Sequence, residues 1–331
     1  MKKLLVIALI LIGTASRAGS EADGTLRFKS GVDETNSAAQ DDFDRHGLQR
    51  DILLAFDRLH SDLTERRGIV DGFVTLVARD VLYLHAGAPL IQGRDETRDF
   101  LAMVFAGPSS FRLRWSTMTG DVSEDGRLGY TIGWTELTIT APDGRTTVQH
   151  GKYVSFWRKR QGIWRVEAYV RNPSPGPPPP PPEGFPLLAG DHGIPQPGEI
   201  EETRAQLLEN DAQFSKLSVE QGRAVAFPAY VAEDGVQVVG GGQMVFGIED
   251  ITRFFSGAPI EQVLSWTPMF SDAPRSGDLG FTVGNAIFRI PQPDGTFLTS
   301  YSKYLTVWAR QKDGSWKYLI DAGNGSPPPT G

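Results

Sequence analysis

A chain of 331 residues exceeds the usual size of one compact domain, so two domains of ordinary size are expected. Hydrophobic residues make up 40% of the sequence, which is enough for two cores. The formal net charge of -7 argues against nucleic-acid binding, because that binding requires a basic surface. The chain has no cysteine, which excludes disulfides, thiolate metal sites and cysteine nucleophiles.

The N-terminus has the pattern of a secretory signal peptide. Lys2 and Lys3 precede an apolar run from Leu4 to Ile12, and small residues follow as far as Ala18. The run is too short for a membrane span, which needs about 20 apolar residues. We therefore expect residues 1–18 to be removed, the mature protein to be periplasmic or secreted, and no membrane association to remain after cleavage. Residues 19–45 are polar and acidic, which predicts a flexible segment.

The first domain is predicted over residues 46–171. Apolar residues at helical spacing indicate two helices, one around Leu53–Leu63 and one around Ile69–Leu76. A short strand at 81–85 and a turn lead to a helix opening at 93–105, where Asp95 and Glu96 in the first turn complement the helix dipole. Three long antiparallel strands complete the prediction, and the Pro-Asp-Gly at 142–144 predicts a tight hairpin between the first two. This order of elements indicates an α+β domain with helices packed on a sheet.

Residues 172–198 are rich in proline, which favours an extended polyproline II spacer between domains. Docking of a partner module that recognises polyproline is the alternative interpretation. The chain then repeats itself over a second domain at 199–323. At a shift of 151, 15 of the 43 positions from Trp115 to Trp157 are identical, without a gap, to those from Trp266 to Trp308. Such agreement indicates one fold, duplicated. Residues 324–331 are predicted to be a flexible tail.

Several repeated phrases carry a family resemblance. They are "QGRDETRDF", "FGIEDITRFF", "SGDLGFTVGN", "PDG" and "KYLTVWARQKDGSWKYLID". With these the chain resembles the nuclear-transport-factor-2-like superfamily, specifically its SnoaL-like group, over about 48–171 and 201–323. The first copy departs from the pattern with Arg127 in place of the acid at Asp278. The resemblance implies two cone-shaped α+β barrel domains, each with helices on a curved antiparallel sheet and an apolar pocket at one end.

The aromatic pattern of the strands suggests that the two copies pair. Tyr130 and Phe156 lie on one face of the predicted sheet, and Tyr153 and Trp157 lie on the other. One face packs on the helices, so the other needs a partner. Members of the superfamily commonly pair through this outer face. We therefore expect an internal pseudo-dimer within one monomeric chain.

Two residues are candidates for catalysis, Asp321 from the resemblance and His85 from its position on a strand. Asp321 occupies the acidic position that closes the family's "W-K-x-x-x-D" phrase, where the first copy has Tyr169. A carboxylate bonded to a neighbouring loop is the alternative role for Asp321. His85 shares a face of its short strand with Tyr83.

Further residues are expected to line ligand pockets. The hairpin register predicts that Glu136 faces His150 and that Trp134 faces Lys152. The Glu136–His150 pair is either a proton relay or a surface cross-strand pair. Trp115 and Trp266 either belong to the core or line the pockets. The predicted pocket residues are Tyr83, Trp115, Trp134, Glu136, His150, Tyr153, Trp266, Asn285 and Tyr304.

No cofactor or metal is expected. The five histidines show no close spacing shared with carboxylates, and no phosphate-cradling glycine loop or Gly-x-Ser-x-Gly elbow occurs. Three functions stay open. The chain binds a small, largely apolar organic molecule in one or both pockets; it is an acid/base isomerase, cyclase or lyase; or it is a non-catalytic interaction module. An acid buried in a roomy cavity favours the enzyme, an apolar cavity favours binding, and filled pockets favour the module.

Overall fold

The computed structural model describes residues 34–179 and 195–328, with side chains described from residue 45 of the first range. The predicted signal peptide and residues 180–194 of the predicted linker lie outside the described residues. The first domain begins with three helices and two short strands, namely α1 (Glu34–Arg67), α2 (Ile69–Phe73), β1 (Val77–His85), β2 (Ile91–Gln92) and α3 (Arg94–Val104). Four long strands follow, namely β3 (Ser110–Val122), β4 (Leu128–Thr140), β5 (Thr146–Arg160) and β6 (Ile163–Pro173).

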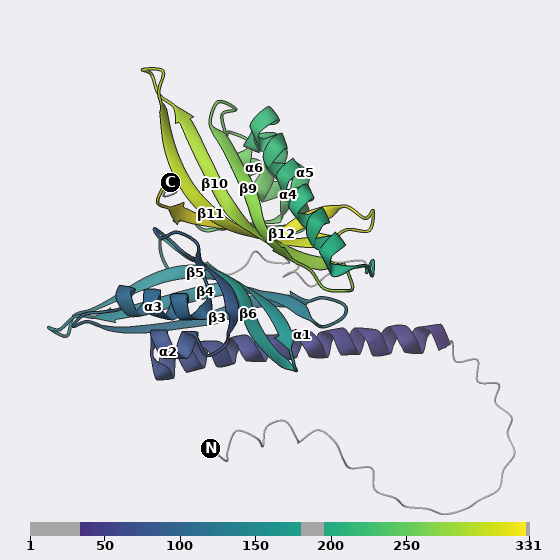
Figure 1. Cartoon of the computed structure of the whole chain (residues 1–331), viewed down its shortest axis with the longest axis horizontal. Helices are drawn as coiled ribbons and strands as arrows, with labels where there is room; N and C mark the ends of the chain where they lie inside the picture. Colours follow the sequence, from purple (N-terminus) through teal and green to yellow (C-terminus); the bar gives the residue numbers. More distant parts are fainter. Residues whose placement is uncertain (1–33, 180–194, 329–331) are drawn as a thin grey trace, which may run out of the picture. The chain divides into compact units, whose positions relative to one another are not determined.

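The second domain repeats this order. Its first elements are α4 (Ile200–Gln221), α5 (Arg223–Tyr230), β7 (Val231–Val238), β8 (Met244–Phe246) and α6 (Gly247–Phe255). Its long strands are β9 (Val263–Asp272), β10 (Leu279–Pro291), β11 (Phe297–Arg310) and β12 (Trp316–Ser326). Figure 1 shows the helices of each domain against one face of its own sheet. The predicted duplication of one α+β fold is therefore confirmed.

Within the described residues each sheet has six strands, in the orders β2-β1-β6-β5-β4-β3 and β8-β7-β12-β11-β10-β9. Two features differ from the sequence prediction. There are four long strands per domain, because β3 and β9 form an edge of each sheet. The sheets are mixed, not purely antiparallel, since β1 pairs with β6 and β7 pairs with β12 in parallel. Local sequence patterns identify hairpins, but they do not specify which distant strand a short strand will join.

The predicted hairpin register is confirmed. Glu136 lies opposite His150 and Trp134 lies opposite Lys152 across β4 and β5. Gly144, in the connecting turn, has φ of 83°, a left-handed conformation that glycine adopts without strain. The register matters for function because it fixes which side chains of β4 and β5 share a face.

The two sheets pack against each other through their outer faces, which form one continuous apolar core. On β4 and β5 the alternate residues Tyr130, Ile132 and Phe156 belong to this core, as do Phe281 and Val307 of the second domain. The rings of Phe156 and Phe281 lie 4.6 Å apart between centroids. Tyr153 and Trp157, on the other parity, pack among residues of the first domain's own helices. The predicted internal pairing of the two copies is confirmed.

Two asparagines hold the domains together by a reciprocal set of hydrogen bonds. Asn172 Nδ2 donates to the carbonyl oxygens of Val238 (3.2 Å) and Gly323 (2.9 Å) in the second domain. Asn324 Nδ2 donates to those of Leu84 (3.0 Å) and Arg171 (3.4 Å) in the first. Both asparagines are buried. They therefore satisfy backbone acceptors that the apolar interface shields from water.

These asparagines correct two predicted boundaries. Asn172 begins the predicted linker but lies in β6, and Asn324 begins the predicted tail but lies in β12. At the other end, α1 begins at Glu34, inside the segment 19–45 that was predicted to be flexible. Glycine and proline near the strand ends concealed the extensions of β6 and β12, which pair with β5 and β11 of their own domains and also contact the other domain.

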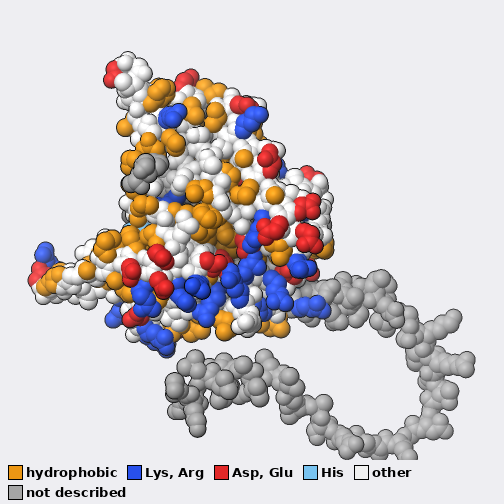
Figure 2. Space-filling model, viewed as in Figure 1, with side chains coloured by type: hydrophobic (Ala, Val, Ile, Leu, Met, Phe, Trp, Pro, Cys, Tyr) orange, Lys and Arg blue, Asp and Glu red, His pale blue; other side chains and the backbone are white. Residues whose placement is uncertain are grey.

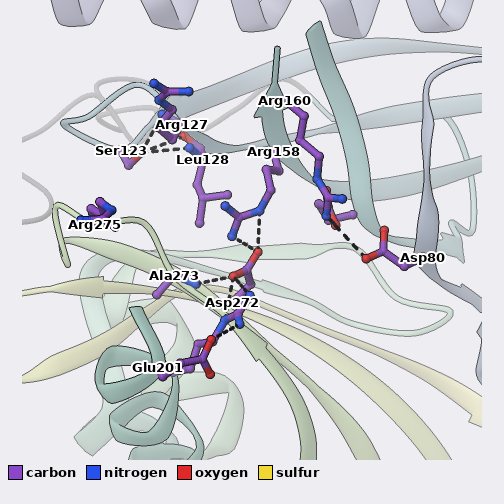
Figure 3. Close-up of polar contacts among 12 residues, drawn as sticks. Asp80, Ser123, Arg127, Leu128, Arg158, Arg160, Glu201, Asp272, Ala273 and Arg275 are labelled. Carbon is purple, nitrogen blue, oxygen red and sulfur yellow. Dashed lines mark hydrogen bonds and ion pairs between the residues drawn. The ribbon is translucent and has the colours of Figure 1, made fainter. Parts of the chain in front are cut away.

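Charged side chains border the interface. Figure 3 shows Arg158 of β5 pointing at Asp272, the last residue of β9. Arg158 Nε donates to Asp272 Oδ2 at 2.8 Å, while Arg204 of α4 donates to Oδ1 with Nε at 2.9 Å and Nη2 at 2.6 Å. In the view of Figure 2, basic side chains gather on the surface of the first domain, beside acidic ones. One buried carboxylate thus receives a guanidinium from each domain, which orients the two sheets.

We expect Asn324→Ala to lower the free energy of unfolding by about 1–3 kcal/mol, because two buried carbonyls lose their side-chain donor. Asn285→Ala is the matched control, since Asn285 is exposed and donates only to the sulfur of Met269. Urea unfolding measures both variants. Equal stabilities for the two variants would contradict the reciprocal hydrogen bonding across the interface.

Candidate functional site

The second domain contains a cavity of about 520 Å³ between its helices and the inner face of its sheet. Eight of the residues that line it are aromatic, and these come from the helices and from β9, β10 and β11. The aromatic lining residues are Phe214, Phe227, Phe254, Phe255, Trp266, Phe288, Tyr301 and Tyr304. Such a space suits a small, largely apolar molecule.

Asp321 of β12 is the acidic residue among the described residues that line this cavity. Thr306 Oγ1 donates to its Oδ1 at 2.6 Å, and Gln237 Nε2 donates to its Oδ2 at 2.7 Å. Desolvation raises the pKa of the Asp321 carboxyl, while these two hydrogen bonds oppose the rise. Asp321 is half-buried as a residue and is one of the residues that line the cavity. A ligand in the cavity can therefore reach this carboxyl.

A second buried carboxylate, Asp211 of α4, lies behind the cavity wall and positions two aromatic residues of it. Its Oδ1 accepts from Trp266 Nε1 at 2.7 Å, and its Oδ2 accepts from Tyr304 OH at 2.7 Å. Desolvation raises the pKa of Asp211 to about 6, against the effect of these bonds. Asp211 itself is buried and is not a lining residue, so its role is to hold the wall.

The first domain has the same supporting carboxylate in the equivalent place. Asp57 of α1 accepts from Trp115 Nε1 at 3.1 Å and from Tyr153 OH at 2.5 Å. Both aromatic residues are buried. Trp115 and Tyr153 are therefore core residues that the helix fixes to the sheet, although Trp115 also borders a hollow of about 340 Å³ beside Pro177 and Pro178.

Tyrosines fill the cone of the first domain. Tyr83 and Tyr169 stack with centroids 5.7 Å apart, Phe73 lies 4.9 Å from Tyr169, and Tyr153 lies 6.2 Å from it. Tyr83 and Tyr169 are 5% and 1% exposed. In the second domain Gln237 and Asp321 occupy the same paired register as Tyr83 and Tyr169. Two smaller side chains in place of two rings leave space for the cavity.

Three of the predicted pocket residues lie on the other face of the first sheet. Trp134 belongs to the interface core, on the same parity as Tyr130. Glu136 and His150 line a separate hollow of about 340 Å³ beside Pro177 and Pro178. Arg114 Nη2 lies 2.9 Å from Glu136 Oε1, so the carboxylate of Glu136 forms an ion pair with Arg114. The assignment of these residues to a cone pocket is wrong, because both faces of the strand carry aromatics and alternation does not say which is inner.

The remaining predicted residues divide between the two domains. Asn285 is exposed, since it shares the outer parity of β10. His85 packs on Phe100 in the first domain, with centroids 5.0 Å apart, and desolvation lowers its pKa. Asp321, Trp266 and Tyr304 line the second cavity together. The structure therefore separates the two predicted catalytic residues, and Asp321 is the one at an open cavity.

Sequence reasoning missed Gln237, Thr306 and Asp211. The repeat alignment contained a signal for them, because it places Gln237 at Tyr83, Thr306 at Ser155 and Asp211 at Asp57. A position where the two copies carry side chains of different size, such as Gln237 and Tyr83, indicates the cavity. A position where both copies carry aspartate, Asp211 and Asp57, indicates the shared framework.

Within residues 45–179 and 195–328, no group of three or more histidine, aspartate or glutamate side chains is placed to hold a metal ion. The helices in the described part of the chain include none with the length and apolar character that a membrane crossing requires.

Comparison with known families gives a match within the first domain. Residues 58–167 match the family model of the SnoaL-like domain. The match covers about a third of the chain and lies within the first domain, so this part of the chain is similar to a SnoaL-like domain; the second domain repeats its topology. The predicted resemblance is confirmed. No curated protein matches the chain.

Solved structures of similar proteins include a ketosteroid isomerase-like protein from Erwinia carotovora atroseptica SCRI1043. Its sequence is 18% identical, the alignment covers 38% of this chain and 95% of that chain, and the TM-score is 0.33. An NTF2-like protein with a cystatin-like fold from Novosphingobium aromaticivorans has 20% identity, 38% and 82% coverage and a TM-score of 0.32. An uncharacterized protein with a cystatin-like fold from Caulobacter vibrioides has 15% identity, 40% and 92% coverage and a TM-score of 0.31.

The raised pKa of Asp211 predicts a pH dependence of stability. The folded state holds the proton up to about pH 6, whereas the unfolded state releases it near pH 4, so this stabilisation is lost as pH rises through that window. The loss amounts to about 2–3 kcal/mol. We expect the wild type to lose this contribution between pH 4 and pH 7 and Asp211→Asn to lack it. A plot of the free energy of unfolding against pH should therefore have a more positive slope for the variant than for the wild type.

The difference between slopes isolates Asp211 from other titrating groups, such as His60, whose pKa burial lowers to about 4. Asp294→Asn is the control, because hydrogen bonds from Thr296 lower the pKa of that exposed carboxyl, which keeps it ionised over this range. Identical slopes for wild type and Asp211→Asn would contradict the burial of a protonatable carboxyl behind the cavity wall.

Proposed function

We propose that the protein is an exported, tandem SnoaL-like protein that binds one small, largely apolar organic molecule, and that the binding site is the cavity of the second domain. The observation that supports this most strongly is the contrast between the two cones. The second has about 520 Å³ of aromatic-lined space, whereas rings fill the first. The first domain then serves as the structural partner of the binding domain. Export rests on the N-terminal sequence pattern.

The cavity has a polar end that gives the site a preferred ligand orientation. Asp321 and Thr306 contribute side-chain oxygen atoms there. Gln237 donates a hydrogen bond to Asp321 and accepts one from Tyr318 OH (3.3 Å), which together fix its position. The walls at Phe227, Phe254 and Phe288 are aromatic. A molecule with an apolar body and a hydroxyl or carbonyl at one end fits this arrangement.

Binding is testable with N-phenyl-1-naphthylamine, a neutral apolar dye that fluoresces when it leaves water. We expect one saturable site per chain. Ser302→Trp fills the cavity from β11 and should weaken binding by at least about tenfold. Val148→Trp, at an exposed position of the corresponding strand of the first domain, should leave binding unchanged. Equal binding by the two variants would contradict the assignment of the site.

A second candidate function is acid/base catalysis in the same cavity, and the environment of Asp321 favours it. Desolvation raises the pKa of this carboxyl toward the range useful for proton transfer, and the group borders space that a substrate can occupy. The ionised form would act as the general base. Thr306 and Gln237 keep its oxygens in place.

The base is testable with 5-nitrobenzisoxazole, a small aromatic substrate for proton abstraction. The carboxylate takes the proton from C3, the N–O bond breaks, and a cyanonitrophenolate forms without any co-reactant. We expect a rate above that of buffer which rises with pH as Asp321 ionises, and a loss of about 100-fold or more in Asp321→Asn. Asp313→Asn, in an exposed turn, is the control. Retention of the full rate by Asp321→Asn would rule out Asp321 as the base.

A further inference from the structure

An arginine borders the aromatic cavity of the second domain. Arg223 is the first residue of α5, and its guanidinium carbon lies 4.6 Å from the centroid of the Phe288 ring. Its Nη2 donates to Gln262 Oε1 at 3.0 Å. Both Arg223 and Phe288 line the cavity. The cation is thus held by a ring and an amide at the cavity wall.

The hydrogen-bonding capacity of this guanidinium is incompletely used. Its Nε is buried and has no hydrogen-bond partner among the described residues. The ion pairs between described side chains include none that joins Arg223 to a carboxylate. Desolvation lowers the pKa of Arg223, yet an arginine stays charged at neutral pH. Among the described residues, Gln262 is the one hydrogen-bond acceptor recorded for the Nη groups, so the remaining Nη–H donors at the cavity wall can pair with an acceptor that a ligand supplies.

The repeat indicates that this charge is not part of the common framework. The position equivalent to Arg223 in the first domain is Ile69, a buried core residue beside the tyrosine-filled cone. The arginine therefore occurs in the domain that has the cavity, and an apolar residue occurs in the domain whose cone is filled. A charge that stands beside the open cavity and is absent beside the filled cone fits a ligand contact.

We propose that the ligand of the second domain carries an anionic group, a carboxylate or sulfonate, which pairs with Arg223 while its apolar body lies among the aromatic walls. This inference rests on the proposed binding function and adds the chemical class of the ligand, an apolar acid. Phe288 lies opposite Ser300, and Asp321 lies opposite Thr306, six residues further along β11. At the rise of an extended strand the two ends are up to about 20 Å apart, so the site suits an elongated molecule.

A pair of dyes with one apolar body tests the proposal. 8-Anilinonaphthalene-1-sulfonate carries the anion, and N-phenyl-1-naphthylamine lacks it. We expect the sulfonate to bind the wild type about 10- to 100-fold more tightly than the neutral dye, as a charge-assisted hydrogen bond would give. Arg223→Met should reduce the affinity for the sulfonate to that for the neutral dye. The affinity of this variant for the neutral dye should stay within about twofold of the wild-type value. Arg223→Lys should retain part of the preference.

The outcomes separate this inference from the proposed function. If the neutral dye binds, Ser302→Trp prevents it, and Arg223→Met leaves the sulfonate unaffected, the cavity binds ligands but the anionic class is wrong. If Ser302→Trp leaves the binding of both dyes unchanged, the sulfonate occupies another surface and both statements fail. If neither dye binds, both statements fail as well. Thermal unfolding of each variant confirms that the loss of affinity is not a loss of fold.

Discussion

The mutual burial of the two outer sheet faces is the constraint on which the rest of the structure depends. Tyr130, Phe156 and Phe281 lie on faces that a lone SnoaL-like domain would expose to water. An apolar surface of that extent needs a partner, and the second copy in the same chain supplies it. Full burial of each large side chain contributes about 1.5–3 kcal/mol. Because the outer faces are occupied, each cone is left with its inner face for helices and for any cavity.

Duplication within one chain allowed the two copies to diverge at a few positions while the framework stayed the same. The aspartate on the long helix, the tryptophan of the following edge strand and the tyrosine of the third long strand form the same hydrogen bonds in both domains. Around this framework, Tyr83 and Tyr169 fill one cone, and Gln237 and Asp321 leave the other open. One domain thus contributes packing and the other contributes the site.

Much of the fold was predictable from the sequence. Helical spacing and the Pro-Asp-Gly turns are local patterns, and the repeat is found by comparing the sequence with itself. The edge strand β3 was missed because its exposed side carries arginines and serines, as in "SFRLRWS", and this weakens its apolar pattern. The position of Trp134 was assigned to the wrong face for a different reason. A strand buried on both faces does not reveal by alternation which face is inner.

The candidate site was predictable only in part. Asp321, Trp266 and Tyr304 were identified from the resemblance and the repeat. Arg223 and Phe288 meet only after α5 folds over β10, so no spacing in the sequence joins them. The roles of Asn172 and Asn324 depend on the other domain, and their own proline- and glycine-rich surroundings suggested a linker and a tail instead.

A double-mutant cycle on Phe156 and Phe281 tests the pairing of the sheets most directly. The free energies of unfolding of Phe156→Ala, Phe281→Ala and the double variant give the coupling between the two rings. Rings in contact, with centroids 4.6 Å apart, should couple by about 0.5–1.5 kcal/mol. A coupling indistinguishable from zero would contradict contact between the two faces and therefore the internal pseudo-dimer.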